Sequence, residues 1–354
     1  MRFLITGECG FIGRNLARIL EEMGHVHVSV RKNATTSDYA TIREIVTPTS
    51  WHRNKSDADW VPCVHRTTPE RWYRLFSELD VDVVIHNAAT VGTDVVGLHP
   101  DQATLTNVLG TRNVVEGAKR AGTAVSYMGT SVIYDVKKYQ DFPIIEPDDR
   151  NPPTFYGQLK LTGEDIVMRS GAKWNIIRPL FAYGGDGDMN SLIAKTLYAF
   201  LTERDSLDMF LDPSKVKDYI HVDDYCRAVI TACEQGLWGE DYNVAAETAL
   251  NTAEIVTAME EILRDAGFDC PEGSLNKWIN WLPQTEYLGN HRMSSAKFRA
   301  ASGWSPQLTL KDGMARVLES IQAANEDYNP LHYLDDAQSR KIDLVQFFPE
   351  QTDI

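Results

Sequence analysis

Two side chains spaced one helical turn apart, Tyr156 and Lys160, are well suited to move a proton. Four-residue spacing places the phenol and the ammonium on one face of a helix. The positive charge stabilises the phenolate, so we expect the pKa of Tyr156 to fall towards the range that general acid–base catalysis needs. The preceding segment 151–153 reads Asn-Pro-Pro, a typical helix entry. The pair predicts a tyrosine that acts in general acid–base catalysis.

Two hydroxyl residues, Thr130 and Ser131, follow an apolar run that predicts a strand at 124–128. The C-terminal edge of a parallel strand is where ligands bind in such sheets. A hydroxyl there is placed to donate a hydrogen bond to a carbonyl or hydroxyl oxygen of a substrate. The alternative is that a small polar residue caps the strand end.

Glycines at positions 7, 10 and 13 lie between an apolar run at 2–6 and a helical apolar stripe at 11–23. Gly7 permits a tight turn, Gly10 lets the backbone approach a pyrophosphate, and Gly13 lets the helix pack against the sheet. The helix N-terminus offers N–H groups to the phosphates. The motif predicts a dinucleotide-binding loop.

The end of the next strand bears on which dinucleotide binds. Arg31 and Lys32 stand there, where an acidic residue is expected for NAD. A guanidinium pairs with a 2′-phosphate through two hydrogen bonds, and the lysine adds a point charge. We therefore expect NADP(H) to be favoured, with NAD(H) possible. The alternative is that both are solvated loop charges.

Strands and helices alternate along the first half of the chain. Strands are expected at 2–6, 25–30, 81–86, 124–128 and 174–177, and helices at 11–23, 71–79, 101–121 and 156–170. The alternation predicts an α/β fold, a Rossmann-type doubly wound parallel sheet with a smaller C-terminal substrate-binding domain. The expected boundaries are 1–180 with 218–248 for the Rossmann domain, 181–217 with 249–330 for the smaller domain, and 331–354 for a peripheral tail. Residues 33–69 are expected to form a loop-rich insertion.

The bulk composition limits the partners. The 354 residues carry a formal net charge of −15, which argues against nucleic acid or an anionic membrane. No signal peptide is expected, because the N-terminus turns directly into the glycine motif, and no apolar run is long enough to cross a bilayer. The five cysteines contain no CxxC pair, which argues against a zinc site, and their odd number fits a reducing cytoplasm.

Taken in order, these motifs make the chain similar to the extended short-chain dehydrogenase/reductase family, specifically its nucleotide-sugar epimerase/dehydratase branch. The resemblance extends from residue 2 to about 320. Besides the motifs above, it rests on His-Asn-Ala-Ala at 86–89, Thr-Asn-Val-Leu-Gly-Thr at 106–111, Ile-Arg-Pro at 177–179, Lys-Asp-Tyr-Ile-His-Val-Asp-Asp at 217–224 and Ser-Gly-Trp-Ser-Pro at 302–306.

The resemblance implies a role for each matching residue. Tyr156 would be the acid/base, Lys160 would hold the nicotinamide ribose and tune Tyr156, and Thr130 would bind the substrate oxygen. The residues expected to bind the cofactor are Gly7, Cys9, Gly10, Phe11, Ile12, Gly13, Arg31, Lys32, Asn87, Ala88, Ala89, Asn107, Tyr156, Lys160 and Pro179. Those expected to contact the substrate are Thr90, Thr130, Ser131, Phe181, Lys217 and Arg292.

Lys217 and Arg292 match positions where the family often places basic residues near the substrate diphosphate. The alternative for both is a solvated surface charge. The resemblance also suggests a homodimer, with the helices at 101–121 and 156–170 as candidates for the interface.

Three positions depart from the family pattern. Dehydratases follow the threonine with acidic residues, where Ser131 and Val132 stand here, so a 4,6-dehydration lacks its usual acid/base pair. The epimerase-reductases that make GDP-fucose have a cysteine at the place of Val132, which argues against that route as well. Phe181 stands where the family commonly has an asparagine that contacts substrate phosphate. These changes indicate an unusual substrate or an altered cofactor register.

Three functions remain open. The leading one is an oxidoreductase of a nucleotide-linked sugar, which either epimerises C4 or reduces a keto-sugar by hydride transfer. A second is an NADPH-dependent reductase of a non-sugar ketone or aldehyde, which Phe181 favours and Lys217 and Arg292 oppose. A third is a non-catalytic dinucleotide-binding regulator, which has no need of the Tyr156–Lys160 pair.

Overall fold

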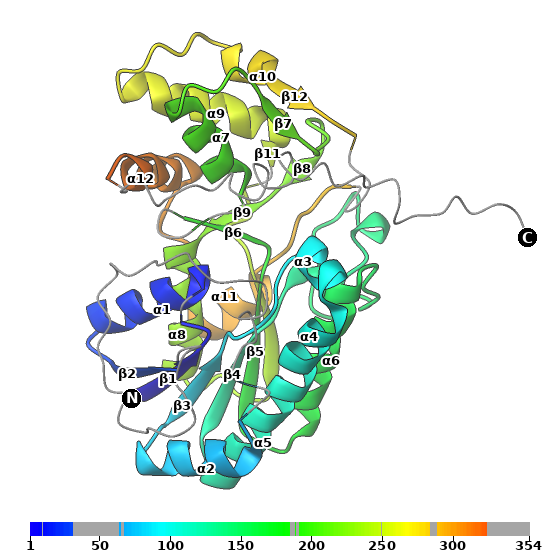
Figure 1. The fold of residues 1–354 in the computed structure, drawn as a ribbon, viewed down its shortest axis with the longest axis vertical. Coiled ribbons are helices and arrows are strands. Elements are labelled where there is room, and N and C mark those ends of the chain that lie inside the picture. The colour runs from blue at the N-terminus through cyan, green and yellow to red at the C-terminus, as the bar shows by residue number, and fades with distance from the viewer. Residues whose placement is uncertain are drawn as a thin grey trace, which may run out of the picture.

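A six-stranded parallel sheet forms the centre of the structure, in the order β10-β5-β4-β3-β1-β2 (Figure 1). The structure is a computed structural model that describes residues 1–8, 10–30, 64, 67–184, 188, 191–248, 250–283 and 289–323. The strands are β1 Arg2–Thr6, β2 Val26–Val30, β3 Val83–His86, β4 Ala124–Met128, β5 Trp174–Pro179 and β10 Glu240–Val244. The predicted Rossmann-type parallel sheet is confirmed. Most of the expected insertion at 33–69 lies outside the described residues.

Alternate residues of the central strands face opposite layers of helices. Leu4 and Val84 lie in the core beneath α2 and α5, whereas Phe3 and Ile85 lie in the core beneath α1 and α8 (Figure 1). Because both faces are covered, these strands are apolar on both sides. The helices of the two layers are α1 Phe11–Glu22, α2 Pro69–Glu78, α5 Thr111–Ala121, α6 Phe155–Arg169 and α8 Val222–Glu234.

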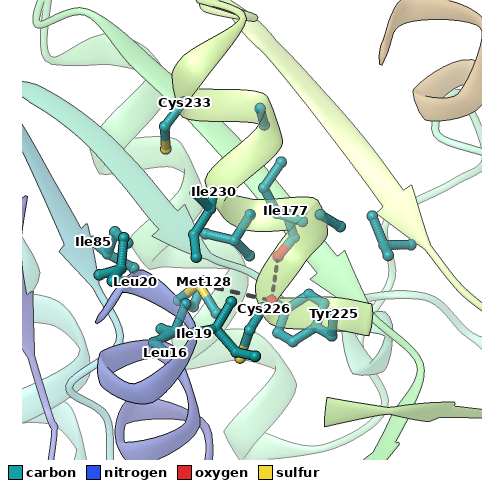
Figure 2. Packing of buried hydrophobic residues seen from close by; sticks show 14 of the residues in the cluster. Leu16, Ile19, Leu20, Ile85, Met128, Ile177, Tyr225, Cys226, Ile230 and Cys233 are labelled. Atoms are coloured by element: carbon teal, nitrogen blue, oxygen red, sulfur yellow. Dashed lines mark hydrogen bonds between the residues drawn. The ribbon is translucent and has the colours of Figure 1, made fainter. Parts of the chain in front are cut away.

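The core between α1 and α8 contains two of the free cysteines (Figure 2). The Tyr225 hydroxyl donates a hydrogen bond to the carbonyl oxygen of Ile177 at 3.0 Å and so ties α8 to β5. Burial raises the pKa of the Cys233 thiol to about 12 and that of Cys226 well above its usual range. Both thiols therefore stay protonated and serve as packing groups rather than nucleophiles.

The segment predicted as one helix at 101–121 consists of three helical pieces. They are α4 Pro100–Thr104, a π-helix Leu105–Gly110 and α5, and the short helix α3 Thr93–Leu98 precedes them. π-helices are rare and occur mostly as single turns inside α-helices, so a continuous α-helix is the default prediction for such a segment. This wider turn contains Asn107, one of the residues expected at the cofactor site.

The C-terminal half builds a second core of its own, away from the sheet (Figure 1). Buried Leu197, Met259 and Val317 bring together three helices around it. The elements there are α7 Leu192–Leu201, β7 Leu207–Met209, α9 Thr252–Asp265, α10 Ser274–Trp278, β12 Ile279–Trp281 and α12 Leu310–Ala323. Between the two cores lie β6 Phe181–Tyr183, β8 Val216–Lys217, β9 Tyr219–His221 and β11 Leu250–Asn251. Helix α11 Ala296–Ser302 belongs to the core of the sheet, because its Phe298 packs there beside Tyr242 of β10. The exact domain boundaries stay a prediction.

Candidate active site

The glycine turn after β1 has room for backbone but not for side chains. Gly7 has φ +75°, and a Cβ there would lie 2.7 Å from Cα of Ala88. A Cβ at Gly13 would lie 2.3 Å from the carbonyl oxygen of Gly7. Gly10 is the exposed N-cap of α1 and has no side chain with which to cap the helix. A helix N-terminus of this kind offers backbone N–H groups to an anion, which is the arrangement expected for a dinucleotide pyrophosphate.

Alanine substitutions separate the structural glycine from the ligand-binding one. Gly13→Ala is expected to destabilise the fold by about 2–3 kcal/mol, because the clash is with backbone. Gly10→Ala is expected to fold normally, since its Cβ would meet only Gly7 O at 3.4 Å, but to bind NAD(H) and NADP(H) at least about tenfold more weakly. Gly97→Ala, with nothing within 4 Å, is the control. Thermal melts and fluorescence titrations measure both effects, and unchanged dinucleotide affinity in Gly10→Ala would contradict the assignment.

Hydrogen bonds tie the end of β3 to the glycine turn. The Ala88 amide donates to the Thr6 hydroxyl at 3.1 Å, and Asn87 Nδ2 donates to Gly7 O at 3.1 Å. The buried His86 ring lies between Thr6 Oγ1, 2.8 Å from Nδ1, and Thr111 Oγ1, 3.0 Å from Nε2. Burial lowers the pKa of His86 to about 3, so the ring is neutral. Asn87 and Ala88 are therefore held beside the glycine turn, as a cofactor-lining role requires.

Asn107 shapes the loop that follows β3. Its Oδ1 accepts from the Thr90 amide at 2.8 Å, and its Nδ2 donates to the Thr90 carbonyl oxygen at 2.9 Å. Both polar atoms of the Asn107 side chain thus form hydrogen bonds with the backbone of Thr90. The π-helical turn presents this buried amide to the loop. Ala89, the residue before Thr90, is half-buried. Asn107 acts on the loop conformation, and Thr90 is positioned by it.

The Lys160 amine is buried under the edge of β4. Its Nζ donates to the carbonyl oxygen of Met128 at 2.6 Å and lies 4.2 Å from the centre of the Tyr127 ring. Burial lowers its pKa to about 8, although the negative charge of Glu164 opposes that change. The residue is only 4% exposed, so the ammonium acts on its immediate neighbours and not on solvent.

Helix α6 brings Tyr156 to the turn that follows Thr130. A Cβ at Gly157 would lie 2.5 Å from the carbonyl oxygen of Val132, so the first turn of α6 rests directly on this segment. Tyr156 is half-buried one turn before Lys160, and the half-buried Thr130 stands at the strand edge. The Thr130 hydroxyl accepts a long hydrogen bond of 3.4 Å from the Val132 amide, so it also caps the short helix Ser131–Ile133.

A buried ionic network supports α6 from below. Arg178 on β5 makes two hydrogen bonds of 2.9 Å to the Glu164 carboxylate and an ion pair with Asp241 on β10. The Tyr134 hydroxyl accepts a third hydrogen bond from the same guanidinium at 3.1 Å. A Cβ at Gly129 would lie 2.6 Å from Arg178 Cγ. The network therefore packs directly beneath the residue before Thr130 and fixes how α6 lies on the sheet.

A second group of predicted residues lies where the two cores meet. Lys217 at the end of β8 is 3% exposed, so the alternative of a solvated surface charge is wrong for it. Its Nζ lies 2.9 Å from Nδ1 of His291 and 5.4 Å from the centre of the Phe181 ring. Arg292 is half-buried and donates from Nη2 to the Gln140 carbonyl oxygen at 2.8 Å.

The remaining predicted residues divide into placed and unplaced ones. Phe11 and Ile12 open α1 and are half-buried, Ser131 is buried, and Pro179 is the buried last residue of β5. The predictions for Cys9, Arg31 and Lys32 fall outside the described residues. Sequence reasoning missed three residues. His291 contacts Lys217, the charge of Glu164 acts on Lys160, and Arg178 pairs with Glu164. A signal existed for Glu164, which follows Lys160 at the same four-residue spacing.

Two further features of the described chain bear on the chemistry. No group of three or more His, Cys, Asp or Glu side chains in the described ranges could hold a metal ion. No helix in the part of the chain that the structure describes is both long and apolar enough to cross a membrane.

The chain is similar in sequence and in fold to several known proteins. The model of the NAD dependent epimerase/dehydratase family matches residues 3–245. A dTDP-glucose 4,6-dehydratase of Mycolicibacterium smegmatis is 27% identical over 348 residues, which cover 94% of this chain and 96% of that protein. A UDP-glucose 4-epimerase of the same species is 25% identical over 337 residues, 90% of this chain and 98% of that protein. The crystal structure of a Bacillus anthracis dTDP-glucose 4,6-dehydratase in complex with NAD has the same fold, with TM-score 0.73 at 20% identity over 94% of this chain and 99% of that one.

Proposed function

Because the chain belongs to the NAD dependent epimerase/dehydratase family, we propose that it oxidises and re-reduces C4 of a nucleotide-linked sugar, with Tyr156 carrying the proton. One observation carries the choice of reaction. The Tyr156 turn of α6 rests on the segment after Thr130, and that segment offers a serine and a valine, Ser131 and Val132, but no carboxylate. Oxidation and reduction at one carbon need one proton carrier, whereas elimination of water needs a further acid and base.

Each group at the site has a separate role in the proposed reaction. A nicotinamide dinucleotide held at the glycine turn supplies the hydride acceptor and donor. Tyr156 takes the proton from the sugar hydroxyl as it becomes a ketone, and returns it on reduction. The Thr130 hydroxyl donates a hydrogen bond to the same oxygen. The positive charge of Lys160 stabilises the phenolate form of Tyr156, and burial strengthens this interaction between the two charges.

A second candidate is reduction of a keto-sugar with NADPH. The pair Arg31 and Lys32, in the sequence after β2, supports NADP(H) as the preferred dinucleotide. A non-sugar ketone is less well supported, because the buried Lys217 is a costly group to keep in a site for an uncharged substrate. The expected homodimer and the cytoplasmic location stay predictions.

The test is a product assay combined with identification of the bound dinucleotide. The purified protein is incubated with UDP-glucose and with dTDP-glucose, and the products are separated by chromatography. A 4-epimer formed without net consumption of dinucleotide supports the proposal. A 4-keto-6-deoxy product would contradict it. Mass spectrometry of the denatured protein distinguishes NAD from NADP, and NADPH oxidation by a keto-sugar alone supports the second candidate.

The protonation of Lys160 predicts the alkaline side of the pH–rate profile. Its pKa lies near 8, below the usual lysine range, so the ammonium loses its proton as the pH rises through 8. Tyr156 then loses the charge that stabilises its phenolate, and kcat is expected to be roughly tenfold lower at pH 9 than at pH 7. Steady-state rates from pH 6 to 10 measure this. A rate that stays level to pH 10 would show that Lys160 does not govern the proton transfer.

A further inference from the structure

The loop that follows β3 is fastened to the fold at both of its ends. At its start, the Ala88 amide donates to the Thr6 hydroxyl of β1 at 3.1 Å. At its end, the Asn107 side chain forms hydrogen bonds of 2.8 and 2.9 Å with the backbone of Thr90. Thr6 is 0% exposed and Asn107 is 1% exposed. Buried side chains of two other elements therefore hold residues 88–90.

The position of this loop sets the room at the glycine turn. A Cβ at Gly7 would lie 2.7 Å from Cα of Ala88, so the backbones of the two segments pack without space for a side chain. Asn87 Nδ2 also donates to the Gly7 carbonyl oxygen at 3.1 Å. A shift of the loop therefore shifts the turn beside which a dinucleotide pyrophosphate is expected to lie.

The neighbours of the His86 ring decide which of its nitrogens carries the proton. Burial lowers the pKa of His86 to about 3, so at neutral pH only one nitrogen is protonated. Nδ1 lies 2.8 Å from Thr6 Oγ1, and Nε2 lies 3.0 Å from Thr111 Oγ1. The Thr111 hydroxyl donates its own proton to the Asn107 carbonyl oxygen at 2.7 Å, so from the ring it can only accept. The ring proton is therefore on Nε2, and Nδ1 accepts from the Thr6 hydroxyl.

These contacts form one chain of hydrogen bonds with a single direction. It runs from the amide of Ala88 to Thr6, His86, Thr111 and the carbonyl oxygen of Asn107. With the ring proton on Nδ1, the proton of the Thr6 hydroxyl would have no acceptor among the contacts that the structure describes. A buried donor without an acceptor is costly, so the chain favours one arrangement of its members.

We propose that His86 and Thr111 are positioning residues of the dinucleotide site, whose hydrogen bonds hold residues 88–90 against the glycine turn. Both residues are 1% exposed, so they act through the loop and not by contact with the ligand. Loss of one member leaves a buried donor unpaired, and movement of the loop relieves that cost. The inference rests on the dinucleotide binding that the proposed function includes, and not on which reaction follows.

Fluorescence titration of the full chain with NADH and with NADPH tests the role of Thr111. Thr111→Val keeps the shape of the side chain and removes its hydroxyl. Both dinucleotides are expected to bind at least about tenfold more weakly to this variant, because binding has to restore a loop conformation that the free protein has left. Thr111→Ser keeps the hydroxyl and is expected to bind them within about threefold of wild type.

Thr106→Val is the matched control. Thr106 lies on the π-helix five residues before Thr111 and is 0% exposed, and its hydroxyl has no hydrogen-bond partner in the described part of the chain. The same substitution there is expected to leave both affinities unchanged. A loss in Thr106→Val equal to that in Thr111→Val would overturn the proposal, because any change in this helical stretch would then disturb the site.

A proton–nitrogen correlation spectrum of the histidine side chains tests the tautomer in the wild-type protein. The signals of His86, identified by their absence in His86→Gln, are expected to show a neutral ring with its proton on Nε2. A proton on Nδ1 would break the chain and overturn the proposal. This readout depends on the direction of the hydrogen bonds, which a merely space-filling role of the ring would not fix.

The outcomes separate the inference from the proposed function. Unchanged affinity in a folded Thr111→Val overturns the positioning role and leaves the proposed function standing. Where Thr111→Val does not fold by thermal melt, Thr6→Val, which removes the other hydroxyl bound to the ring, replaces it with the same expected loss. The expected pattern of affinities in a protein that converts no sugar nucleotide supports the positioning role and contradicts the proposed function. Absence of NADH and NADPH binding by wild type overturns both.

Discussion

Tyr156→Phe is expected to lower kcat by about 10²- to 10⁴-fold, because the variant keeps the ring and loses the proton. Tyr156 stands on the first turn of α6, which rests on the carbonyl oxygen of Val132 through Gly157. The ring stays available for packing against the buried cluster of Val96, Ala103 and Leu159, so the fold is expected to be unaffected. Dinucleotide binding at the glycine turn is also expected to be retained. The substitution is therefore expected to lower kcat and to leave folding and dinucleotide affinity unchanged.

The measurement is the turnover rate on the sugar nucleotide identified by the product assay, with dinucleotide affinity measured by fluorescence. Tyr73→Phe, on α2 beside Arg120 and on the opposite side of the sheet edge from Thr130, is the matched control and is expected to keep full activity. Full activity of Tyr156→Phe would exclude Tyr156 as the proton carrier.

Arg178→Met is expected to lower the free energy of unfolding by about 3–5 kcal/mol. The side chains of Arg178 and Glu164 are both 0% exposed, so removal of the guanidinium leaves a buried carboxylate without its partner. Asp241 loses an ion pair as well, and the lowered pKa that this carboxyl has beside Arg178 is expected to return towards its usual range. The cost of desolvating these charges is far larger than the packing that methionine restores.

Urea denaturation at neutral pH measures this effect. Arg74→Met, which removes an exposed arginine from its pair with Glu70, is the control and is expected to leave the midpoint unchanged. A loss below about 1 kcal/mol in Arg178→Met would show that the network is not the support of α6 inferred here. Because Glu164 lies one turn beyond Lys160, the variant is also expected to lose activity at temperatures where it remains folded.

Local patterns were sufficient for the order of elements. The apolar runs at 2–6 and 124–128 are strands with those bounds, and the helix expected at 156–170 spans Phe155–Arg169. These predictions succeed because strands covered on both faces are apolar throughout, and glycine, proline and threonine mark the ends of helices locally. The π-helix within 101–121 was not predicted, because π-helices are rare and a continuous α-helix is the default prediction.

By itself, the sequence was enough to predict which residues carry chemistry: the glycines of the first turn, the Tyr156–Lys160 pair and the hydroxyl of Thr130. These are local signals, because each depends on neighbours within a few residues. Tertiary structure alone decided the environment of those groups. Burial beside Met128 sets the charge of Lys160, and residue 291 meets Lys217 only through the fold. Charge states depend on solvent exposure and on contacts between residues far apart in the chain, and neither is written in local spacing.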